Sequence, residues 1–381
     1  MKAIFIKDNF LVLFVALMLL FPSQTTRAAE VSGYLSVTGP CNLEFPKDNG
    51  AHPGYRTEWW YYSGNLRSKS GELYGFQLTF FRRQITPLRV EKKWPKPKSA
   101  WRTHQIYLAH AAVTDIVGRQ HLQAETLARS ALGIAGASQL KGGTRIFLKN
   151  WMAKISRTTH RLMVTTNEFS YDLTLKPEKP PVMHGQRGYS QKGSTPDRAS
   201  CYYSFTRLET KGTISIGGKT MNVKGLAWMD HEFSTATLEP GLVGWDWYGL
   251  QLSNGSEIMA YMLRKEDGSI SRASEGTFID RSGRSRRLHK EDIKITVLDT
   301  WKSSRSNTRY PARWRMRILP LKLDLIIAPN LLDQEMRTFE STDITYWEGS
   351  VDVSGTAGGR AIEGKGYVEL TGYAEPFDAP L

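Results

Sequence analysis

The sequence predicts an all-β protein in which one strand-rich unit is present twice. The first copy opens with T-E-W-W-Y-Y-S-G-N-L at residues 57–66, and the second opens with G-W-D-W-Y-G-L-Q-L at residues 244–252. The ends of the two copies, at 211–228 and 348–369, are also alike. Internal repeats are an architectural signal, and repeated strands close into antiparallel barrels or sandwiches because closure removes exposed strand edges. We therefore expect two consecutive antiparallel domains of related topology.

The first 28 residues stand apart from this repeat. Lys2 and Lys7 precede an apolar run at 10–21, and small residues follow at 26–28. The run is too short to cross a bilayer, so the pattern predicts a secretory signal peptide at residues 1–28, with an uncleaved anchor as the alternative. We expect the protein to be secreted across the inner membrane into the periplasm or the extracellular space.

Length and charge limit the number of domains and the partners. The 381 residues, 40% of them hydrophobic, suit two cores. We place the domains at 29–236 and 241–381, with a linker at 235–240. The formal net charge is +14, and it becomes 14 − 2, or +12, without the three basic residues and one acidic residue of the signal peptide. This charge suits peripheral contact with an anionic envelope surface, whereas no nucleic-acid-binding motif is present. The sequence leaves the oligomeric state open.

Short strands follow one another along the chain, as 33 glycines and 17 prolines would suggest. A period of two in apolar side chains, or a turn between two such runs, marks strands in both copies. These ranges are 74–80, 162–166, 169–175, 258–263 and 275–279. Only 123–135 is predicted to be helical.

The segment 82–102 interrupts the strand pattern. It contains eight lysines and arginines, with Trp94 and Trp101 among them. A solvated loop is the favoured interpretation, and a lid or a membrane-surface contact is the alternative. The two cysteines, Cys41 and Cys201, could form a structural disulfide in an oxidising compartment, but the sequence gives no distance between them.

An acidic motif in the first copy is the leading candidate for chemistry. On a strand, Trp228, Asp230 and Glu232 share one face, while His231 faces the other way. Burial on an aromatic face would raise the pKa of Asp230 and leave it protonated, so that it can donate a proton. We predict a catalytic role for Asp230 and a lesser one for Glu232. The alternative is that both carboxyls cap loop amides at a barrel rim.

The second copy lacks this acid when the two ends are aligned by eye. Placing Gly225 opposite Gly366 puts Asp230 opposite Thr371. A framework that is kept while an acid is lost predicts a single working site.

Glu58 and His110 are further candidates with strong structural alternatives. Glu58 shares a strand face with Trp60 and Tyr62. A charge inside an aromatic strand is costly unless it is paired, so Glu58 is either catalytic or bound to a buried arginine, and the pairing is favoured. His110 lies on an apolar face, where a hydrogen-bonded core histidine is more common than a ligand-binding one.

Four segments together resemble the AttH / carotenoid 1,2-hydratase family. They are A-H-P-G-Y-R-T-E-W-W-Y-Y at 51–62, G-Y-S-Q-K-G at 188–193, W-M-D-H-E at 228–232 and Y-W-E-G at 346–349. The resemblance implies two consecutive lipocalin-like β-barrels, and it also points to Asp230. Relatives include enzymes that add water to terpenoid double bonds, catalysts of pericyclic reactions, and exported proteins called predicted secreted hydrolases.

Several other chemistries lack their motifs. Ser190 stands in G-Y-S-Q-K rather than in a G-x-S-x-G elbow, which weakens a serine hydrolase. There is no H-E-x-x-H or C-x-x-C, and residues 230–232 alternate in direction along a strand, so we expect no metal. No glycine-rich nucleotide loop precedes a helix, and we expect no cofactor.

We expect a hydrophobic, terpenoid- or lipid-like small molecule to bind where the first barrel meets the second. The predicted ligand-binding residues are Trp60, Tyr62, His110, Trp228, Trp247, Tyr261 and Trp347, although such rings also fill barrel cores. One function is acid-catalysed hydration or isomerisation of a double bond. The other is a non-catalytic periplasmic carrier associated with an ABC-type envelope transporter.

Overall fold

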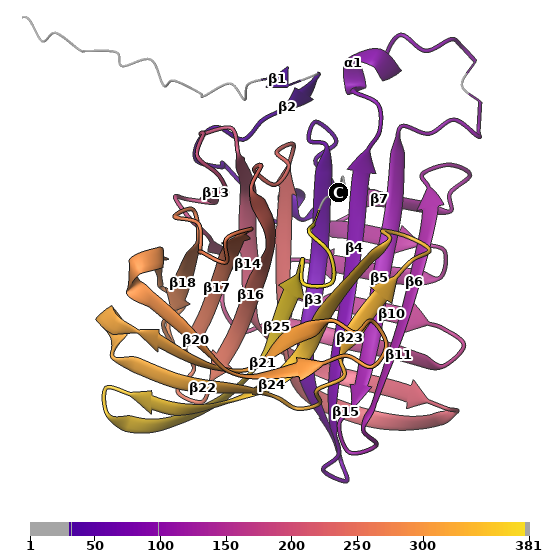
Figure 1. The fold of residues 1–381 in the computed structure, drawn as a ribbon. Helices are drawn as coiled ribbons and strands as arrows, with labels where there is room; N and C mark the ends of the chain where they lie inside the picture. The colour runs from indigo at the N-terminus through magenta and orange to yellow at the C-terminus, as the bar shows by residue number, and fades with distance from the viewer. Residues whose placement is uncertain (1–29, 32, 98, 378–381) are drawn as a thin grey trace, which may run out of the picture.

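Two antiparallel sheets make up almost all of the molecule (Figure 1). The structure, a computed structural model, describes residues 30–31, 33–97 and 99–377. The predicted signal peptide lies outside the described residues. A short pair, β1 (Glu30–Val31) and β2 (Tyr34–Leu35), precedes the two sheets. Within the described ranges, no helix has the length and apolar character needed to cross a membrane.

The first sheet forms a nearly closed barrel with the order β6-β5-β4-β3-β15-β14-β11-β10-β9-β8-β7, and β12 and β13 pair with β14. Its strands are β3 (Thr57–Ser68), β4 (Leu73–Gln84), β5 (Gln105–Asp115), β6 (Gln120–Arg129), β7 (Ala135–Leu140), β8 (Gly143–Leu148), β9 (Trp151–Ser156), β10 (His160–Thr165), β11 (Phe169–Pro177), β12 (Val182–Met183), β13 (Tyr189–Gln191), β14 (Ala199–Ile216) and β15 (Lys219–Ser234).

The second sheet forms a half-barrel with the order β19-β18-β17-β16-β25-β24-β22-β21-β20, and β23 pairs with β24. Its strands are β16 (Leu242–Leu252), β17 (Glu257–Lys265), β18 (Glu275–Ile279), β19 (Ser285–His289), β20 (Ile293–Lys302), β21 (Arg309–Ile318), β22 (Leu323–Pro329), β23 (Glu335–Thr338), β24 (Ile344–Ala357) and β25 (Arg360–Thr371). The described helices are single turns: η1 (Lys47–Asn49), α1 (Leu88–Glu91), η2 (Lys290–Asp292) and η3 (Leu319–Leu321).

The two sheets share a topology, as the repeat predicts. In each, the opening strand, β3 or β16, lies between the strand that follows it and the last strand of its own sheet, β15 or β25. The chain passes from one sheet to the other between β15 and β16, where the linker was predicted. The all-β fold of two related lipocalin-like units is therefore confirmed, with one unit less closed than the other.

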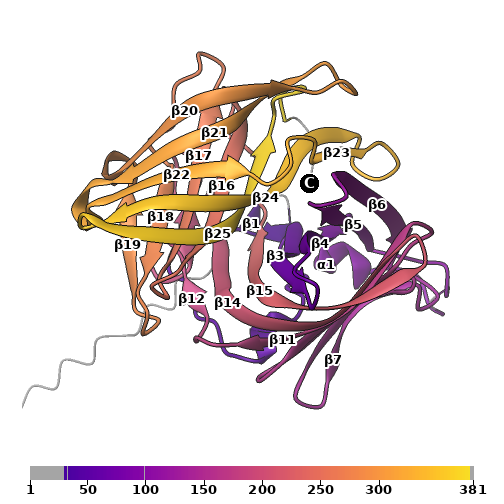
Figure 2. The ribbon, with the colours of Figure 1, turned by 90° about the horizontal axis from the view of Figure 1, so that it is seen from below.

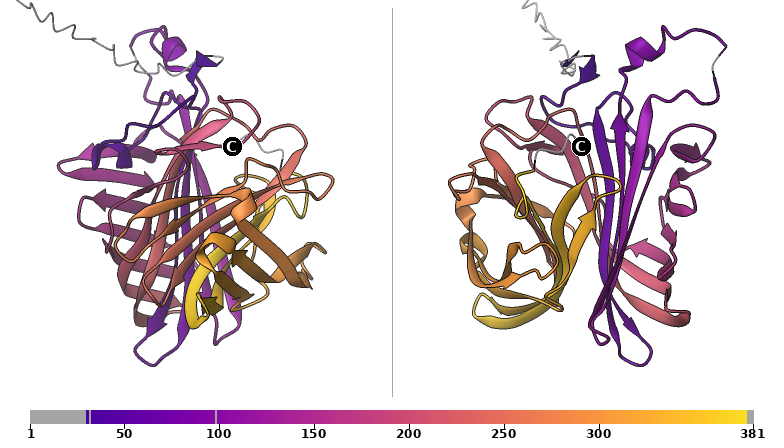
Figure 3. Two further views of the ribbon diagram at one scale, coloured as in Figure 1. Left: turned by 90° about the vertical axis from the view of Figure 1, so that its left-hand side faces the viewer. Right: turned by 45° about the vertical axis from the view of Figure 1, so that its right-hand side comes forward.

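The sheets stand face to face, as the views from below and from the side show (Figures 2 and 3). Strands β3, β4, β5 and β15 consequently have two buried faces. On β3, Trp60 and Tyr62 point into the first barrel, and Trp59 and Tyr61 point towards the second sheet. Polar contacts also join the sheets: the amide of Gln251 on β16 donates to the carbonyl oxygen of Ala227 on β15 at 2.9 Å.

The predicted strands are present, as β4, β10, β11, β17 and β18, but the predicted helix at 123–135 is wrong. Most of that segment is β6, which pairs with β5 along its length, and the rest leads into β7. Leu122, Ala124 and Ala128 point from β6 to the barrel core. Burial of these side chains outweighs the helical preference of the segment's Gln, Glu and Ala residues.

The segment 82–102 is divided between a strand and a loop. Arg82 and Arg83 belong to β4, and Arg82 is fully buried. The rest projects, with α1, from the end of the barrel near β1 and β2 (Figure 1). Trp101 is 64% exposed there.

Cys41 and Cys201 form a disulfide, which settles the pairing that the sequence left open. Their Cα atoms are 6.0 Å apart, and the bond joins the N-terminal arm to β14 across 160 positions of sequence. The arm packs here as part of a small apolar cluster with Val37 and Phe233.

We predict that removing this bond by Cys41→Ser with Cys201→Ser lowers the free energy of unfolding by about 2–5 kcal/mol, because a long loop in the unfolded chain is no longer closed. Urea unfolding without reductant measures the difference. The same protein treated with reductant is the control, and equal stability of all three samples contradicts the prediction.

Candidate functional site

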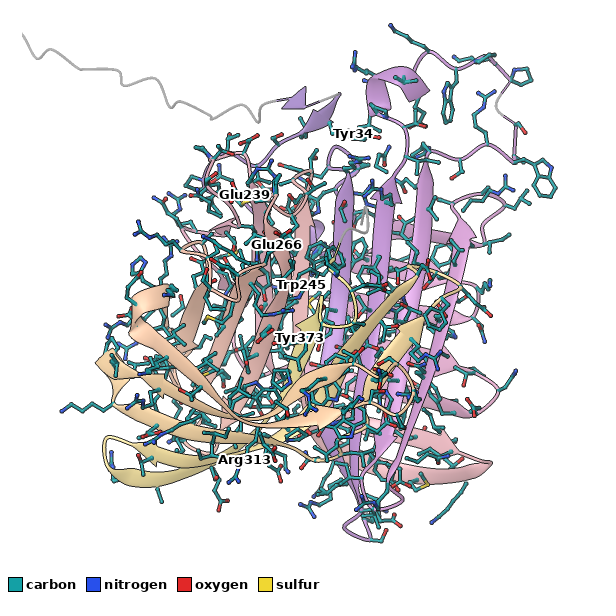
Figure 4. The ribbon with its side chains drawn as sticks, viewed as in Figure 1. Tyr34, Glu239, Trp245, Glu266, Arg313 and Tyr373 are labelled. Atoms are coloured by element: carbon teal, nitrogen blue, oxygen red, sulfur yellow. A yellow bond between two sulfur atoms is a disulfide. The ribbon has the colours of Figure 1, made fainter. Side chains whose placement is uncertain are left out.

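A cavity of about 430 Å³ lies between the two sheets. Its wall combines the outer face of the first barrel with side chains of β16, β24 and β25 and of the segment between β15 and β16. Figure 4 labels Trp245 at this junction. The residues that the argument uses are Trp59, Tyr61, His110, Lys192, Tyr202, Asp230, Glu232, Trp245, Trp247, Tyr261, Tyr346, Glu348 and Glu369. Aromatic rings and carboxyl groups therefore dominate the wall.

Asp230 is the most strongly hydrogen-bonded carboxyl of this cavity. Its Oδ1 accepts from Trp228 Nε1 at 2.6 Å and also contacts the hydroxyl of Ser204, and its Oδ2 accepts from the hydroxyl of Tyr202 at 2.7 Å. The Tyr202 oxygen accepts in turn from Trp247 Nε1 at 3.0 Å, which links the carboxyl to the second sheet.

Burial decides the protonation of Asp230. Only 4% of its surface is exposed, and desolvation raises the pKa of Asp230 to about 7, although the bonds from Ser204, Tyr202 and Trp228 oppose this. Near neutral pH both forms are populated. A carboxyl in this state can act as a general acid, since its pKa lies close to the working pH.

Glu232 lies in the same wall but has a different partner. The ammonium of Lys192 lies 3.2 Å from Glu232 Oε1, and the hydroxyl of Ser200 also bonds this oxygen. The same ammonium lies 3.7 Å from the ring centroid of Tyr261 and 4.9 Å from that of Tyr202. The charge of Glu232 is therefore balanced by Lys192, whereas Asp230 has no ion pair within the described residues.

The second sheet carries its own acid at the position equivalent to Asp230. Asp230 pairs with Tyr61 of the W-W-Y-Y opening, and Glu369 pairs with Trp247, the equivalent residue of the W-D-W-Y opening. The alignment that placed Asp230 opposite Thr371 was thus two residues out of register. The expectation that the second copy lost its acid is wrong, because strand pairing, which fixes the equivalence, differs from the spacing of the glycines.

Glu369 and its neighbour Glu348 extend the acidic wall. They lie directly opposite each other on β25 and β24 and so share a face. Glu369 Oε1 accepts from Trp245 Nε1 at 3.1 Å and from Thr371 Oγ1 at 2.8 Å. Desolvation raises the pKa of Glu369 to about 7, and burial together with the charge of Glu369 raises the pKa of Glu348 well above its usual value.

Glu58 belongs to a separate network inside the first barrel, in which Glu58, Arg82 and His231 are fully buried and His52 is partly exposed. Arg82 Nε lies 2.7 Å from Glu58 Oε2, and His52 Nδ1 and His231 Nε2 lie 2.7 and 2.8 Å from Oε1. Burial opposes ionisation, but the charges of Arg82 and His52 outweigh it and hold the pKa of Glu58 well below its usual value. The pairing with a buried arginine, expected from sequence, is thus present.

The network has the side chains of a metal site but a different electrostatic character. One ligand atom each of His52, Glu58 and His231 lies within 4.8 Å of the others. The guanidinium of Arg82 already balances the single carboxylate, and the Glu58 charge raises the pKa of His52 to about 9 in spite of its burial. Arg82 and His52 face the two carboxylates of Glu58 and Asp48, so the charges balance within an ion-pair cluster and no cation is needed.

The predicted aromatic ligand-binding residues are divided between three places. Trp247, Tyr261 and His110 line the cavity. Trp228 is buried beside it and bonds Asp230. Trp60 and Tyr62 lie in the first barrel core and Trp347 in the second, so these three predicted ligand-binding residues do not line the cavity.

The pairing register of β3 and β15 explains why Trp60 does not reach the cavity. Asp230 is paired with Tyr61, whereas Trp60 is paired with His231 and stacks on it at 4.8 Å. The sequence predicts Trp60 as a ligand-binding residue because this pairing cannot be read from the sequence. The cavity residues that this prediction missed are Trp59, Tyr61, Tyr202, Trp245, Tyr346, Glu348 and Glu369. The sequence does carry an indication of some of them, in the aromatic residues at positions 59 and 61 and in the acid of Y-W-E-G at 346–349.

His110 has two hydrogen-bond partners, as the structural interpretation expected. Its ring nitrogens lie 3.0 Å from the hydroxyl of Tyr346 and 2.9 Å from that of Ser341. Burial lowers the pKa of His110 to about 3, so the ring is neutral at ordinary pH. His110 therefore joins the two sheets and shapes the cavity without carrying charge.

Comparisons with known proteins agree with this architecture. The AttH-like family model matches residues 36–373. The crystal structure of a putative AttH from Nitrosomonas europaea is 32% identical, with a TM-score of 0.77, over 89% of this chain and 99% of the other. Kievitone hydratase from Nectria haematococca is 16% identical, with a TM-score of 0.67, over 92% and 98%. CghA with Sch210972 is 10% identical, with a TM-score of 0.52, over 91% and 98%. No significant sequence match is found among curated proteins.

We predict that Glu58→Gln destabilises the protein by about 3–5 kcal/mol, because it leaves the buried Arg82 charge without its partner. The matched control is Asp172→Asn, which breaks the exposed pair with Arg161 and should cost about 0–1 kcal/mol. Urea unfolding at pH 7 compares both variants with the wild type. Equal effects of the two substitutions would show that Glu58 does not stabilise the fold.

The raised pKa of Asp230 predicts a pH-dependent stability. The folded protein keeps a proton on Asp230 between about pH 4 and 7 that the unfolded chain has lost. The contribution of Asp230 is therefore full below about pH 4 and is lost as the pH rises to about 7, by up to about 1.4 kcal/mol per pH unit. Asp230→Asn removes it, so the variant should gain stability relative to the wild type from pH 5 to pH 8. The free energy of unfolding of both proteins is measured at pH 5 and pH 8. An equal difference between the variant and the wild type at the two pH values contradicts the raised pKa of Asp230.

Proposed function

Because the chain belongs to the AttH-like family and its cavity holds a protonatable carboxyl among aromatic rings, we propose that it hydrates or isomerises a double bond of an apolar small molecule by acid catalysis. The observation that carries this proposal is Asp230, buried in the cavity wall with a pKa of about 7. A terpenoid- or lipid-like substrate suits the aromatic wall.

Asp230 acts first in this reaction. Its proton is transferred to one carbon of the double bond, and the adjacent carbon becomes a cation. The rings of Tyr61 and Trp247 lie in the same wall and stabilise such a cation by about 0.5–2 kcal/mol each. In a hydration, water attacks the cation and its spare proton returns to the Asp230 carboxylate. In an isomerisation, a neighbouring C–H proton returns instead.

A hydrogen-bonded chain behind Asp230 supports its role. Ser204 lies 2.6 Å from His184 Nε2, and His184 Nδ1 lies 2.8 Å from the hydroxyl of Thr277. Burial lowers the pKa of His184 to about 3, so its ring is neutral and donates from one nitrogen only. Ser204 can therefore donate to ionised Asp230 or, when the ring changes tautomer, accept from the protonated acid.

Other parts of the chain support the remaining features of this proposal. We propose export from the N-terminal pattern, and the disulfide suits an oxidising compartment. The basic loop around α1, with exposed Trp101, suits peripheral contact with an envelope surface or an ABC-type transporter. A serine hydrolase is not supported, because the Ser190 hydroxyl bonds Glu275 and Tyr261 rather than a histidine.

The second candidate function is a non-catalytic carrier of a hydrophobic ligand. The aromatic wall favours it, because rings such as Trp59 and Trp245 bind an apolar molecule without any proton transfer.

We predict that the protein incorporates deuterium into C–H bonds of isoprenoid alkenes such as geraniol or farnesol in D₂O, as proton transfer to carbon requires. Asp230→Asn should lower the rate about 10²–10⁴-fold and still bind the same alkenes. The control is Asp352→Asn, an exposed change on β24. Mass spectrometry of the recovered alkene measures the label. Full labelling by Asp230→Asn contradicts the acid role, and binding without any label identifies a carrier.

A further inference from the structure

Three carboxyls of the cavity differ from the other buried carboxyls of the described chain. Glu58, Glu232, Asp246, Glu257, Glu275 and Glu335 each have a basic partner at 3.7 Å or less. Within the described ranges, Asp230, Glu348 and Glu369 have no such ion pair. In a chain with a net charge of +14, basic residues are plentiful. Apart from Lys192, which pairs with Glu232, these three cavity carboxyls therefore face no counter-charge in the described chain.

One of these carboxyls, Glu348, interacts with the hydroxyls of Tyr61 and Tyr346 but also has an oxygen atom without a hydrogen bond among the described residues. Glu348 is 2% exposed, and within the described chain its Oε1 is buried without a hydrogen-bond partner. Its side chain lines the cavity. A buried polar atom without a partner is costly, and from the cavity a ligand can supply the missing interaction.

One ammonium group in the cavity wall, that of Lys192, already has the contacts that a cationic ligand would need. The Lys192 ammonium is bound by the Glu232 carboxylate and by the faces of Tyr202 and Tyr261. Tyr61 and Tyr346 lie beside Glu348, and Trp245 and Trp247 lie beside Glu369. Within the described residues, no lysine or arginine pairs with either carboxyl. Carboxylates with aromatic faces are the usual surroundings of a bound ammonium group.

We propose that Glu348 and Glu369 form a cation subsite, which holds a positively charged centre on an otherwise apolar ligand. The proposal rests on the proposed function for the apolar character of the ligand. The charge has two possible sources, an ammonium group carried by the ligand or the carbocation that Asp230 generates. In both cases an alkylammonium ion occupies the subsite, so it is a suitable probe.

Binding of decyltrimethylammonium and of 1-decanol, measured by calorimetry below micelle concentrations, tests the proposal. The two probes share an alkyl chain and differ in charge. The wild type should bind the cation about tenfold or more tightly than the alcohol. Glu348→Gln with Glu369→Gln should remove this preference and leave the affinity for 1-decanol unchanged, because glutamine keeps the size of the side chain.

Two further variants complete the test. The Glu363→Gln variant, which changes an exposed residue near the start of β25, should bind both probes as the wild type does. Glu369→Gln alone, whose amide oxygen can still accept from Trp245 and Thr371, gives a second measurement if the double variant does not fold. Equal affinity of the wild type for the two probes, or an unchanged preference in a folded double or single variant, overturns the proposal.

The preference should also depend on pH. The titratable groups that face the pair are Asp230, Glu232, Lys192, His110, Tyr61, Tyr202, Tyr261 and Tyr346. Between pH 5.5 and 8.5, ionisation of Asp230 and of Glu369 should tighten binding of the cation and leave binding of 1-decanol unchanged. Cation binding that is equally tight at both pH values counts against the subsite.

Experiments can distinguish the two possible sources of the charge, and they can test the catalytic proposal separately from the cation subsite. Native mass spectrometry of the protein purified from its own cells shows an amine if the ligand carries the charge, and a neutral molecule if Asp230 generates it. Deuterium labelling depends on Asp230, whereas the charge preference depends on Glu348 and Glu369. A protein that labels no alkene but prefers the cation refutes only the catalytic proposal.

Discussion

The whole site depends on one constraint, which is that β3 and β15 are buried on both faces. Each residue of these strands enters one of two environments, and the pairing register decides which. Trp60 with His231 faces the barrel, and Tyr61 with Asp230 faces the cavity. A slip by one residue would exchange the two sets. The contact between Glu58 on β3 and His231 on β15, at 2.8 Å, opposes such a slip, because the slip would separate these two buried side chains.

Burial of a carboxyl has opposite consequences on the two sides of this wall. Inside the barrel, Arg82 and His52 keep Glu58 ionised, and the carboxylate serves as the centre of a fixed network. On the cavity side, Asp230 and Glu369 receive hydrogen bonds but no counter-charge, so desolvation dominates and their pKa values rise to about 7. The partners of a buried carboxyl, more than its burial, therefore separate a stabilising group from a reactive one.

The sequence predicts the fold and one half of the site. Repeated openings and alternating side chains give two related β units, and a charge among rings predicts the arginine partner of Glu58. The helix at 123–135 fails because local preference carries no information about the core that Leu122 packs against. Trp60 and Glu369 are misjudged for a different reason. On a strand with two buried faces, the odd-numbered and the even-numbered side chains are both apolar, so alternation cannot show which face meets the cavity. The equivalence of Asp230 and Glu369 is visible only in their cross-strand pairs with Tyr61 and Trp247.

Both barrel interiors are packed with large side chains, such as Trp60 and Tyr62 in the first and Trp314 and Trp347 in the second. The cavity proposed as the ligand site lies outside these cores, on the opposite faces of the same strands. Evolution can therefore change what the cavity accepts by replacing outward residues such as Trp59 or Trp245 while the inward residues preserve folding. Few scaffolds separate stability from recognition so directly along a single strand, and the separation explains how one architecture can serve proteins with unrelated substrates.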